Sequence, residues 1–238
     1  MTTSDYPILI TGGAQRLGFA IAEALLAQNQ PVIVTYRSRR SGVDILEAAG
    51  AVTLHADFAD DQGILKCIET VRSKTKGLRA IIHNASDWVA ERPGCDLSAL
   101  MQRMIQVHVQ APYQINMALR DLLDTPEGFT DIIHMTDFVQ DKGSKKHIAY
   151  AASKAALHNL TLSFSALLAP KTKVNSVAPA LVMFNEGDDE EYRQKALRKS
   201  LLETCPGAQE AVKAVEYLLS SDYVTGRTMY MDGGRHLK

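Results

Sequence analysis

The chain has 238 residues, and its 26 Lys and Arg nearly balance its 27 Asp and Glu, which leaves a formal net charge of −1. This balance argues against non-specific binding to nucleic acid or to an anionic membrane, because both need a strongly basic surface. No apolar run approaches a membrane span, and residues 1–13 show no basic and apolar leader. Three dispersed cysteines exclude a disulfide framework or a zinc ribbon, so we expect a cytoplasmic protein with a large hydrophobic core.

Short apolar runs alternate with longer helical patterns along the whole chain. The expected strands cover residues 7–11, 31–36, 51–55, 78–83, 131–136, 174–177 and 228–231, and the expected helices cover 17–28, 42–49, 60–75, 97–123, 150–168 and 208–221. The strand runs are apolar on consecutive residues, which is typical of strands buried on both faces. This alternation predicts an α/β fold in which helices cover both sides of a parallel sheet.

The first expected strand leads into a glycine-containing loop and then into a helix. Gly12 permits a tight turn, and Gly18 allows the helix to pack closely on its neighbour. The N-terminus of such a helix offers unpaired N–H groups and a positive dipole to a pyrophosphate. The loop therefore predicts a dinucleotide site, with an ordinary strand-to-helix turn as the alternative interpretation.

The end of the second strand indicates which dinucleotide would bind. An NAD site usually has Asp or Glu there, to bind the ribose 2′-hydroxyl. Residues 34–40 contain no acid, and Arg37 and Ser38 instead supply a guanidinium and a hydroxyl for a 2′-phosphate. The sequence thus favours NADPH, while Arg39 and Arg40 also fit a solvated basic turn.

The helix expected at 150–168 opens with Tyr150, and Lys154 follows one turn later on the same face. A free tyrosine has a pKa of about 10 and exchanges protons poorly at neutral pH. We expect the Lys154 ammonium to favour the phenolate and to lower that pKa. The pair would then exchange a proton in step with hydride transfer.

The order of these motifs resembles that of the short-chain dehydrogenase/reductase family, over essentially the whole chain. Further matches are Asn84-Ala85 after the fourth strand, residues 175–179, and residues 224–226 and 232–234. The resemblance implies a single doubly wound Rossmann domain over residues 1–238, with about seven parallel strands. It also implies a homotetramer or homodimer packed through two long helices, and a segment after Pro179 that closes over the substrate. The residues that it implies for NADPH binding are Thr11, Gly12, Arg16, Leu17, Gly18, Arg37, Ser38, Asp57, Phe58, Asn84, Ala85, Ser86, Tyr150, Lys154 and Pro179.

Three departures from the family pattern resemble its pteridine reductase branch. Arg16 replaces the third glycine of the loop. Asp137 replaces the serine that most of the family has thirteen residues before Tyr150. Residues 83–86 read His-Asn-Ala-Ser, where most of the family has Asn-Asn-Ala-Gly.

This resemblance implies NADPH-dependent reduction of a dihydropterin, with 7,8-dihydromonapterin as the main substrate and dihydrofolate as a secondary one. Arg16 and Ser86 would face the pterin and the cofactor phosphates, and Trp88 would stack on the planar pterin ring. A dihydropterin needs a hydride at C6 and a proton at N5, and Asp137 beside Tyr150 would form the proton-donating pair. Burial should raise the pKa of Asp137, whereas the neighbouring lysine acts in the opposite direction. Which group delivers the proton to N5 stays open.

Simpler interpretations exist for several of these residues. Trp88 also fits a surface anchor, Asp137 a strand-end cap and Arg16 a solvated charge. His108 stands where the family often has an asparagine that holds a water near the lysine, so it fits either an altered proton relay or ordinary helix packing. The other histidines lack metal-ligand spacing, and no metal site is expected.

Residues 185–204 begin acidic and end basic. This pattern fits either a solvated helix that complements its own dipole or a mobile substrate flap around residues 183–205. Two other functions stay open. A carbonyl or quinone reductase would share the fold, although its substrate oxyanion would face Asp137 rather than a hydroxyl. A non-catalytic NADPH-sensing protein would also use this fold, although Tyr150 and Lys154 are both retained.

Overall fold

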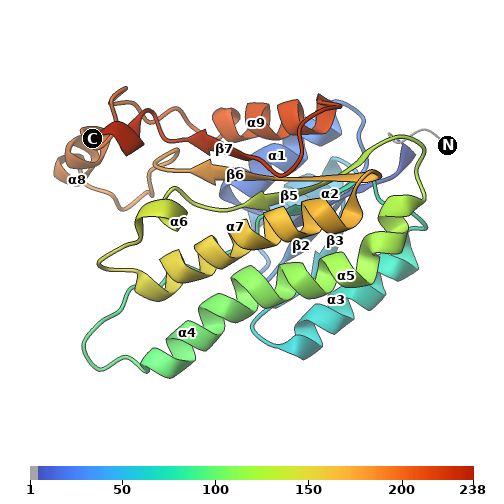
Figure 1. Ribbon diagram of the computed structural model, residues 1–238, viewed down its shortest axis with the longest axis horizontal. Helices are drawn as coiled ribbons and strands as arrows, with labels where there is room; N and C mark the ends of the chain where they lie inside the picture. The colour runs from blue at the N-terminus through green and yellow to red at the C-terminus, as the bar shows by residue number, and fades with distance from the viewer. Residues whose placement is uncertain (1–4) are drawn as a thin grey trace.

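The computed structural model describes residues 5–238, and seven strands in it form one parallel sheet (Figure 1). The strands are β1 Ile8–Thr11, β2 Val32–Tyr36, β3 Val52–His55, β4 Ala80–His83, β5 Thr130–Met135, β6 Thr172–Pro179 and β7 Thr228–Met231. Their order is β3-β2-β1-β4-β5-β6-β7, and every neighbouring pair is parallel. The order reverses between β1 and β4, and ligands of such sheets bind in the crevice at that switch point. The predicted doubly wound sheet is confirmed.

Helices cover both faces of the sheet, as Figure 1 shows with the strands between an upper and a lower helical layer. They are α1 Arg16–Ala27, α2 Ser41–Ala48, α3 Asp61–Lys74, α4 Leu97–Ile105, α5 Ala111–Asp124, α6 Val139–Lys142, α7 Ile148–Leu168, α8 Glu190–Leu197 and α9 Gln209–Ser220. One core cluster joins the sheet to α1, α2 and α9, and the other joins it to α3, α5 and α7. Every residue of β1, β4 and β5 is buried, which suits apolar side chains, although β5 also buries Asp131 and His134.

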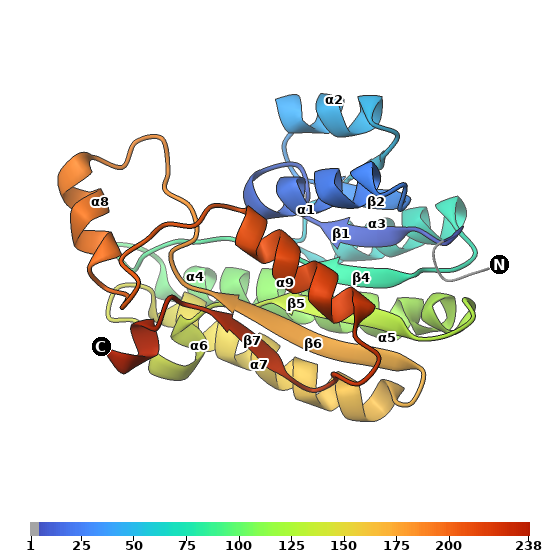
Figure 2. The ribbon, with the colours of Figure 1, turned by 90° about the horizontal axis from the view of Figure 1, so that it is seen from above.

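All seven strands run toward the end of the molecule that carries α6, α8 and the C-terminus (Figure 2). Figure 2 also shows α9 crossing above the sheet on the same side as α1, and these two helices pack against each other. The loops that follow the strands therefore gather at one end of the sheet. In a doubly wound fold this is the end at which side chains of distant segments can meet a ligand.

The structure differs from the expected elements mainly in the helix expected at 97–123. Two α-helical segments, α4 and α5, are joined there by a π-helical turn at Gln106–Gln110, which contains His108. Such π-turns insert one extra residue per turn and often occur at functional sites. The short α6 and a 3₁₀ turn at Arg235–Leu237 were not expected from the pattern. Residues 190–197 form α8 with acids first and a lysine last, as the solvated-helix interpretation predicts.

The expectation that residues 1–13 hold no leader rests partly on residues 1–4, which lie outside the described residues. Between residues 5 and 238, no helix is both long and apolar enough to cross a membrane.

Candidate functional site

The loops after β1 and β4 are bound to each other at the switch point. The Thr11 hydroxyl accepts hydrogen bonds from the backbone N–H groups of Asn84 and Ala85, each at 3.1 Å. The Asn84 side chain donates to the Gly12 carbonyl at 2.8 Å. Gly12 has φ +63°, and a Cβ on it would lie 2.7 Å from the Ala85 Cα. Only glycine fits this position, because the backbone is left-handed and the neighbouring loop touches it.

The N-terminus of α1 is suited to bind an anion. Helix α1 begins after Gln15 without a side-chain cap and without an acid in its first turn, so its first N–H groups face the cleft unpaired. A Cβ on Gly18 would lie 2.4 Å from the Asn84 side-chain nitrogen. The close approach that Gly18 permits is therefore the packing expected of a dinucleotide loop, and these residues fit the diphosphate of NADPH.

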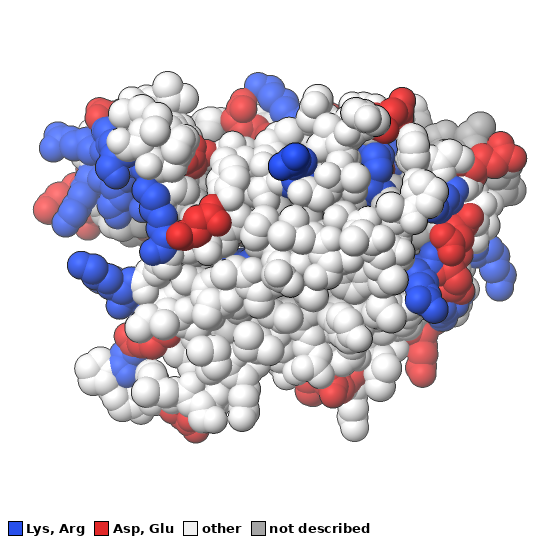
Figure 3. Space-filling view, in the orientation of Figure 1, with Lys and Arg blue, Asp and Glu red and all other residues white. Residues whose placement is uncertain are grey.

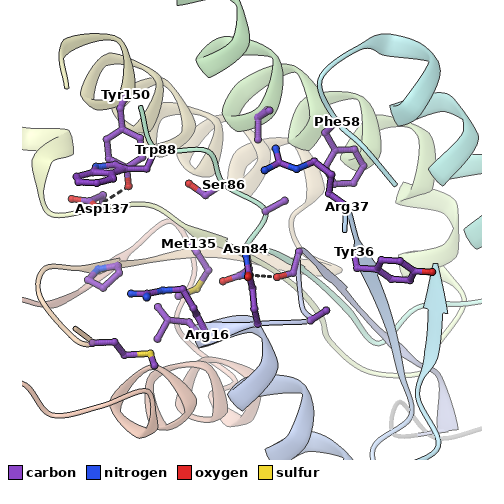
Figure 4. Close-up of a pocket in the computed structure, with 18 of the residues that line it drawn as sticks. Arg16, Tyr36, Arg37, Phe58, Asn84, Ser86, Trp88, Met135, Asp137 and Tyr150 are labelled. Atoms are coloured by element: carbon purple, nitrogen blue, oxygen red, sulfur yellow. Dashed lines mark hydrogen bonds between the residues drawn. The ribbon is translucent and has the colours of Figure 1, made fainter. Parts of the chain in front are cut away.

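A cleft of about 570 Å³ opens at this end of the sheet (Figure 4). Most of the residues predicted to bind the cofactor or the substrate line it: Gly12, Arg16, Leu17, Arg37, Ser38, Asp57, Phe58, Asn84, Ala85, Ser86, Trp88, Asp137, Tyr150, Lys154 and Pro179. Thr11 and Gly18 do not line it but support the loops behind it.

Arg16 connects two distant parts of the cleft. Its backbone has φ +52°, the left-handed region where the family usually has glycine. Its Nη1 donates to the Asn185 Oδ1 at 2.7 Å, so the side chain reaches across to the segment that follows β6. Arg16 is exposed, and this hydrogen bond connects the cofactor loop to the segment around Asn185.

Arg37 forms an ion pair that the sequence did not reveal. Its Nη1 donates to both carboxylate oxygens of Asp87, at 2.9 and 3.1 Å, and the Arg103 Nε donates to the same carboxylate at 2.8 Å. Burial works to raise the pKa of Asp87, but the two guanidinium groups outweigh it and hold that pKa below its usual value. Asp87 thus orients Arg37 at the mouth of the cleft, whereas Arg39 pairs with Asp44 and Glu47 on the surface of α2.

The residues predicted to form the reaction centre lie at the opposite end of the cleft, where Figure 4 shows Tyr150, Asp137 and Trp88 together. The Tyr150 hydroxyl donates to the Asp137 Oδ2 at 2.8 Å, and the other oxygen of Asp137 accepts from the Val139 N–H. Asp137 lies two residues after the end of β5, and Tyr150 lies in the first turn of α7. Burial raises the pKa of Asp137, as the sequence argument expected.

The structure does not show the lowered Tyr150 pKa that was expected from the Lys154 ammonium. Burial and the Asp137 carboxylate raise the pKa of Tyr150 well above 10 instead of lowering it. The Lys154 Nζ lies 5.6 Å from the Tyr150 ring centroid and donates to the Met135 carbonyl at 2.8 Å. Burial also lowers the pKa of Lys154 to about 8, against the opposing attraction of Asp137. The phenol consequently keeps its proton at neutral pH and acts as a donor.

His108 is buried in the π-turn, and its ring nitrogens connect α7 to the loop after β4. The Ser153 hydroxyl donates to the Tyr150 carbonyl, so the His108 Nδ1, 2.8 Å away, must donate to Ser153. The Nε2 then accepts from the Asp87 N–H and the Ser86 hydroxyl, at 3.2 and 2.9 Å. Burial and the charge of the neighbouring lysine keep the pKa of His108 well below 6.5. A neutral His108 thus holds the Ser86 hydroxyl in the cleft.

Trp88 has a stacking partner that sequence reasoning missed. The indole is 64% exposed, and the His147 ring stacks on it with 4.2 Å between centroids and 19° between planes. His147 immediately precedes α7, whose first N–H groups, on Ile148 and Ala149, are capped by the Glu91 carboxylate at 2.9 and 2.8 Å. One face of the indole is therefore covered and oriented by protein. Nothing in the spacing of these residues could have indicated the stack.

The chain is similar to several known proteins over nearly its whole length. The family model described as enoyl-(acyl carrier protein) reductase matches residues 12–236. A dihydromonapterin reductase of Klebsiella pneumoniae is 57% identical over 98% of this chain and 97% of its own length, and one of Escherichia coli is 53% identical over 99% of both. A crystal structure of FolM alternative dihydrofolate reductase 1 from Brucella canis, complexed with NADP, superposes with a TM-score of 0.87. It has 27% identity and covers 100% of this chain and 96% of that one.

The chain belongs to the short-chain dehydrogenase/reductase family. The fold is the one that the family resemblance implied. The described residues, 5–238, contain no cluster of three His, Cys, Asp or Glu side chains arranged to hold a metal ion.

Replacing Lys154 by Met should stabilise the protein at neutral pH while impairing its activity. The lysine pKa falls from 10.5 in the unfolded chain to about 8 in the folded one, so below pH 8 folding must bury an ammonium ion. This cost is fully present below pH 8 and is relieved as the pH rises towards 10.5. We expect Lys154→Met to gain up to about 3 kcal/mol of unfolding free energy at neutral pH.

Urea unfolding of the unmodified protein and of Lys154→Met, from neutral pH to pH 10.5, measures the difference in unfolding free energy. Lys66→Met, on the exposed side of α3, is the control. The gain should shrink as the pH rises above 8. A Lys154→Met protein that is less stable at neutral pH, or a gap that does not depend on pH, would contradict the charged burial of Lys154.

Proposed function

We propose that this protein is an NADPH-dependent dihydropterin reductase. It reduces 7,8-dihydromonapterin to 5,6,7,8-tetrahydromonapterin and, as a secondary activity, dihydrofolate. The observation that carries the proposal is the Tyr150–Asp137 hydrogen bond beside the exposed indole of Trp88. The names of its relatives, dihydromonapterin reductase and FolM alternative dihydrofolate reductase, support the same substrates.

The chemistry of the substrate fits the proton-holding groups of this site. Reduction of the N5=C6 bond adds a hydride at C6 and a proton at N5, and NADPH supplies the hydride when it is bound. Tyr150 keeps its proton because burial and Asp137 raise its pKa. Asp137, whose pKa burial raises, accepts the phenol hydrogen bond and can itself take up a proton. The two side chains together are thus proposed as the source of the N5 proton.

Trp88 is proposed as the stacking surface for the pterin. His147 covers one face of the indole, and the ring is otherwise largely exposed at the reaction-centre end of the cleft. Ser86, whose hydroxyl hydrogen is donated to neutral His108, offers acceptor lone pairs to a ligand in the cleft, and Arg16 offers donors. A planar heterocycle with polar edges is the ligand that matches such a set of groups.

The test of the function compares three substrates with NADPH: dihydromonapterin, dihydrofolate and a simple diketone. We expect kcat/KM to decrease in that order. Trp88→Ala should raise KM for both pterins about tenfold, because aromatic stacking of a base contributes about 1–3 kcal/mol, whereas Trp88→Phe should keep most of the affinity. The exposed Tyr223 gives the matched control, Tyr223→Ala. Faster turnover of the diketone would instead favour a carbonyl reductase. If no substrate is turned over, an NADPH-sensing protein is favoured.

The choice of NADPH is proposed to depend on Arg37 and Ser38. Both line the cleft, and Asp87 orients the Arg37 guanidinium. Arg37→Ala should raise KM for NADPH about 10- to 100-fold, because a hydrogen bond to a charged group contributes about 1.5–3 kcal/mol, and should change KM for NADH little. Arg39→Ala is the control, since Arg39 pairs with acids of α2. Equal effects of Arg37→Ala on both cofactors would contradict a 2′-phosphate contact.

Residues 183–205 are proposed to act as the substrate flap of the single domain. The segment leaves β6 at the mouth of the cleft, and Met183, Asn185 and Tyr192 line that cleft. The hydrogen bond from Arg16 to Asn185 connects the flap to the cofactor loop. A substrate that competes for Arg16 would therefore change how the flap is held.

The protein is further proposed to form a cytoplasmic homotetramer through α4, α5 and α7. Figure 3 shows almost no charged side chains over the middle of this face, and Tyr113, Met117, Leu162 and Leu167 are exposed on α5 and α7. Such a patch is typical of a protein interface. The expected mass in sedimentation equilibrium is four times the 26.1 kDa of the chain. A monomer at micromolar concentration would contradict the proposal.

A further inference from the structure

Four cations gather beside the reaction centre without acidic partners. They are Lys146, Lys195, Lys199 and Arg235, and we refer to them as the basic rim. Lys146, Lys195 and Arg235 are close enough to Lys199 for their charges to lower its pKa. None of the four forms an ion pair within residues 5–238. Figure 3 shows Lys and Arg concentrated at this end of the molecule, over α8 and the C-terminal residues.

The basic rim borders the substrate end of the cleft rather than the cofactor end. The Arg235 guanidinium lies 5.0 Å from the centroid of the Phe138 ring, and its charge acts on Asp137. Lys146 directly precedes His147, the residue that stacks on Trp88. Arg37 and Ser38, proposed for the NADPH 2′-phosphate, line the cleft together with Arg40, and none of the rim residues lines that cleft.

A second cavity, of about 650 Å³, lies against the rim. Lys199 and Arg235 line it, and residues 180–182 separate it from the main cleft because they line both. The acids of this second cavity are already paired: Glu210 with Lys213, and Asp232 with His236. A ligand that extends from the reaction centre past residues 180–182 thus meets positive charge that no carboxylate of the cavity neutralises.

Three acids around the reaction centre are also engaged elsewhere. Glu91 caps the first N–H groups of α7. Asp137 accepts from Tyr150 and from the Val139 N–H. Asp141 accepts from the Tyr230 hydroxyl. Like charges held this close repel one another, and an anion that binds among them relieves the repulsion.

We propose that the basic rim binds the carboxylates of an anionic tail on C6 of the pterin, and that it gives the enzyme its affinity for folate-type substrates. This inference rests on the proposed function. Dihydrofolate carries an aminobenzoyl group that ends in a glutamate with two carboxylates, whereas the triol tail of dihydromonapterin is uncharged. The rim therefore acts on one of the two substrates through charge and on the other hardly at all.

The test measures kcat/KM for dihydrofolate relative to dihydromonapterin. Lys195→Gln/Lys199→Gln should lower this ratio about fivefold to tenfold at low salt, because two exposed ion pairs are lost. The matched control is Lys66→Gln/Lys74→Gln, which removes two exposed charges from α3 and should leave the ratio within about twofold.

Salt and tail length give two independent readouts in the unmodified enzyme. Raising the ionic strength from ~0.01 M to ~0.15 M shortens the screening length from about 30 Å to about 8 Å, so KM for dihydrofolate should rise several-fold while KM for dihydromonapterin stays nearly constant. Dihydrofolate with additional γ-linked glutamates should have a lower KM than the monoglutamate. The double lysine variant should lose both effects.

The outcomes separate the two proposals. If the enzyme reduces dihydromonapterin but the ratio, the salt effect and the effect of extra glutamates are the same in the variant and the control, the basic rim does not bind the tail. If it reduces no dihydropterin, the proposed function itself fails, and the dihydromonapterin assay alone shows this.

Discussion

The bond between the ends of β1 and β4 is the contact on which the site depends. One hydroxyl, that of Thr11, accepts two backbone N–H groups, from Asn84 and Ala85, where the strand order reverses. It aligns the glycine loop with the loop that carries Ser86 and Trp88. The left-handed Gly12 makes this approach feasible, since any Cβ there would collide with the facing backbone. Both walls of the cleft are thereby set by one local contact between strands that are adjacent in space and distant in sequence.

The reaction centre concentrates titratable groups that would be more stable apart. Asp137 and Tyr150 have raised pKa values, and Lys154 a lowered one, chiefly because burial disfavours their charged forms. Each group is held by a specific hydrogen bond, and neutral His108 packs against the Tyr150 ring and binds Ser153. Active sites commonly keep buried titratable groups that lower the stability of the fold, because their shifted pKa values serve proton transfer.

The cleft is divided into ends with different charge arrangements. At the cofactor end, Asp87 lies between Arg37 and Arg103, so the guanidinium groups there are oriented and partly neutralised. At the substrate end, the Trp88 ring stacks on the His147 ring. Burial lowers the pKa of His147, and this favours the uncharged imidazole. Beyond them the basic rim has no ion-pair partners among the described residues. A reductase with this arrangement can bind a neutral ring with tails of different charge.

The sequence by itself determined the features that depend on neighbouring residues or on local spacing. Consecutive apolar residues indicated the strands, and glycines indicated the first turn. The spacing of Tyr150 and Lys154 placed them on one helix face, and the family resemblance implied that Asp137 lies beside Tyr150. Only the tertiary structure revealed contacts between distant segments, because no periodicity relates such residues. Arg16 and Asn185 are 169 positions apart in the sequence, and Arg37 and Asp87 are 50 apart. Trp88 lies in a loop and stacks on His147, which precedes α7. The direction of the Tyr150 pKa shift also required the structure, because it depends on how deeply the phenol is buried and which charge lies nearer to it.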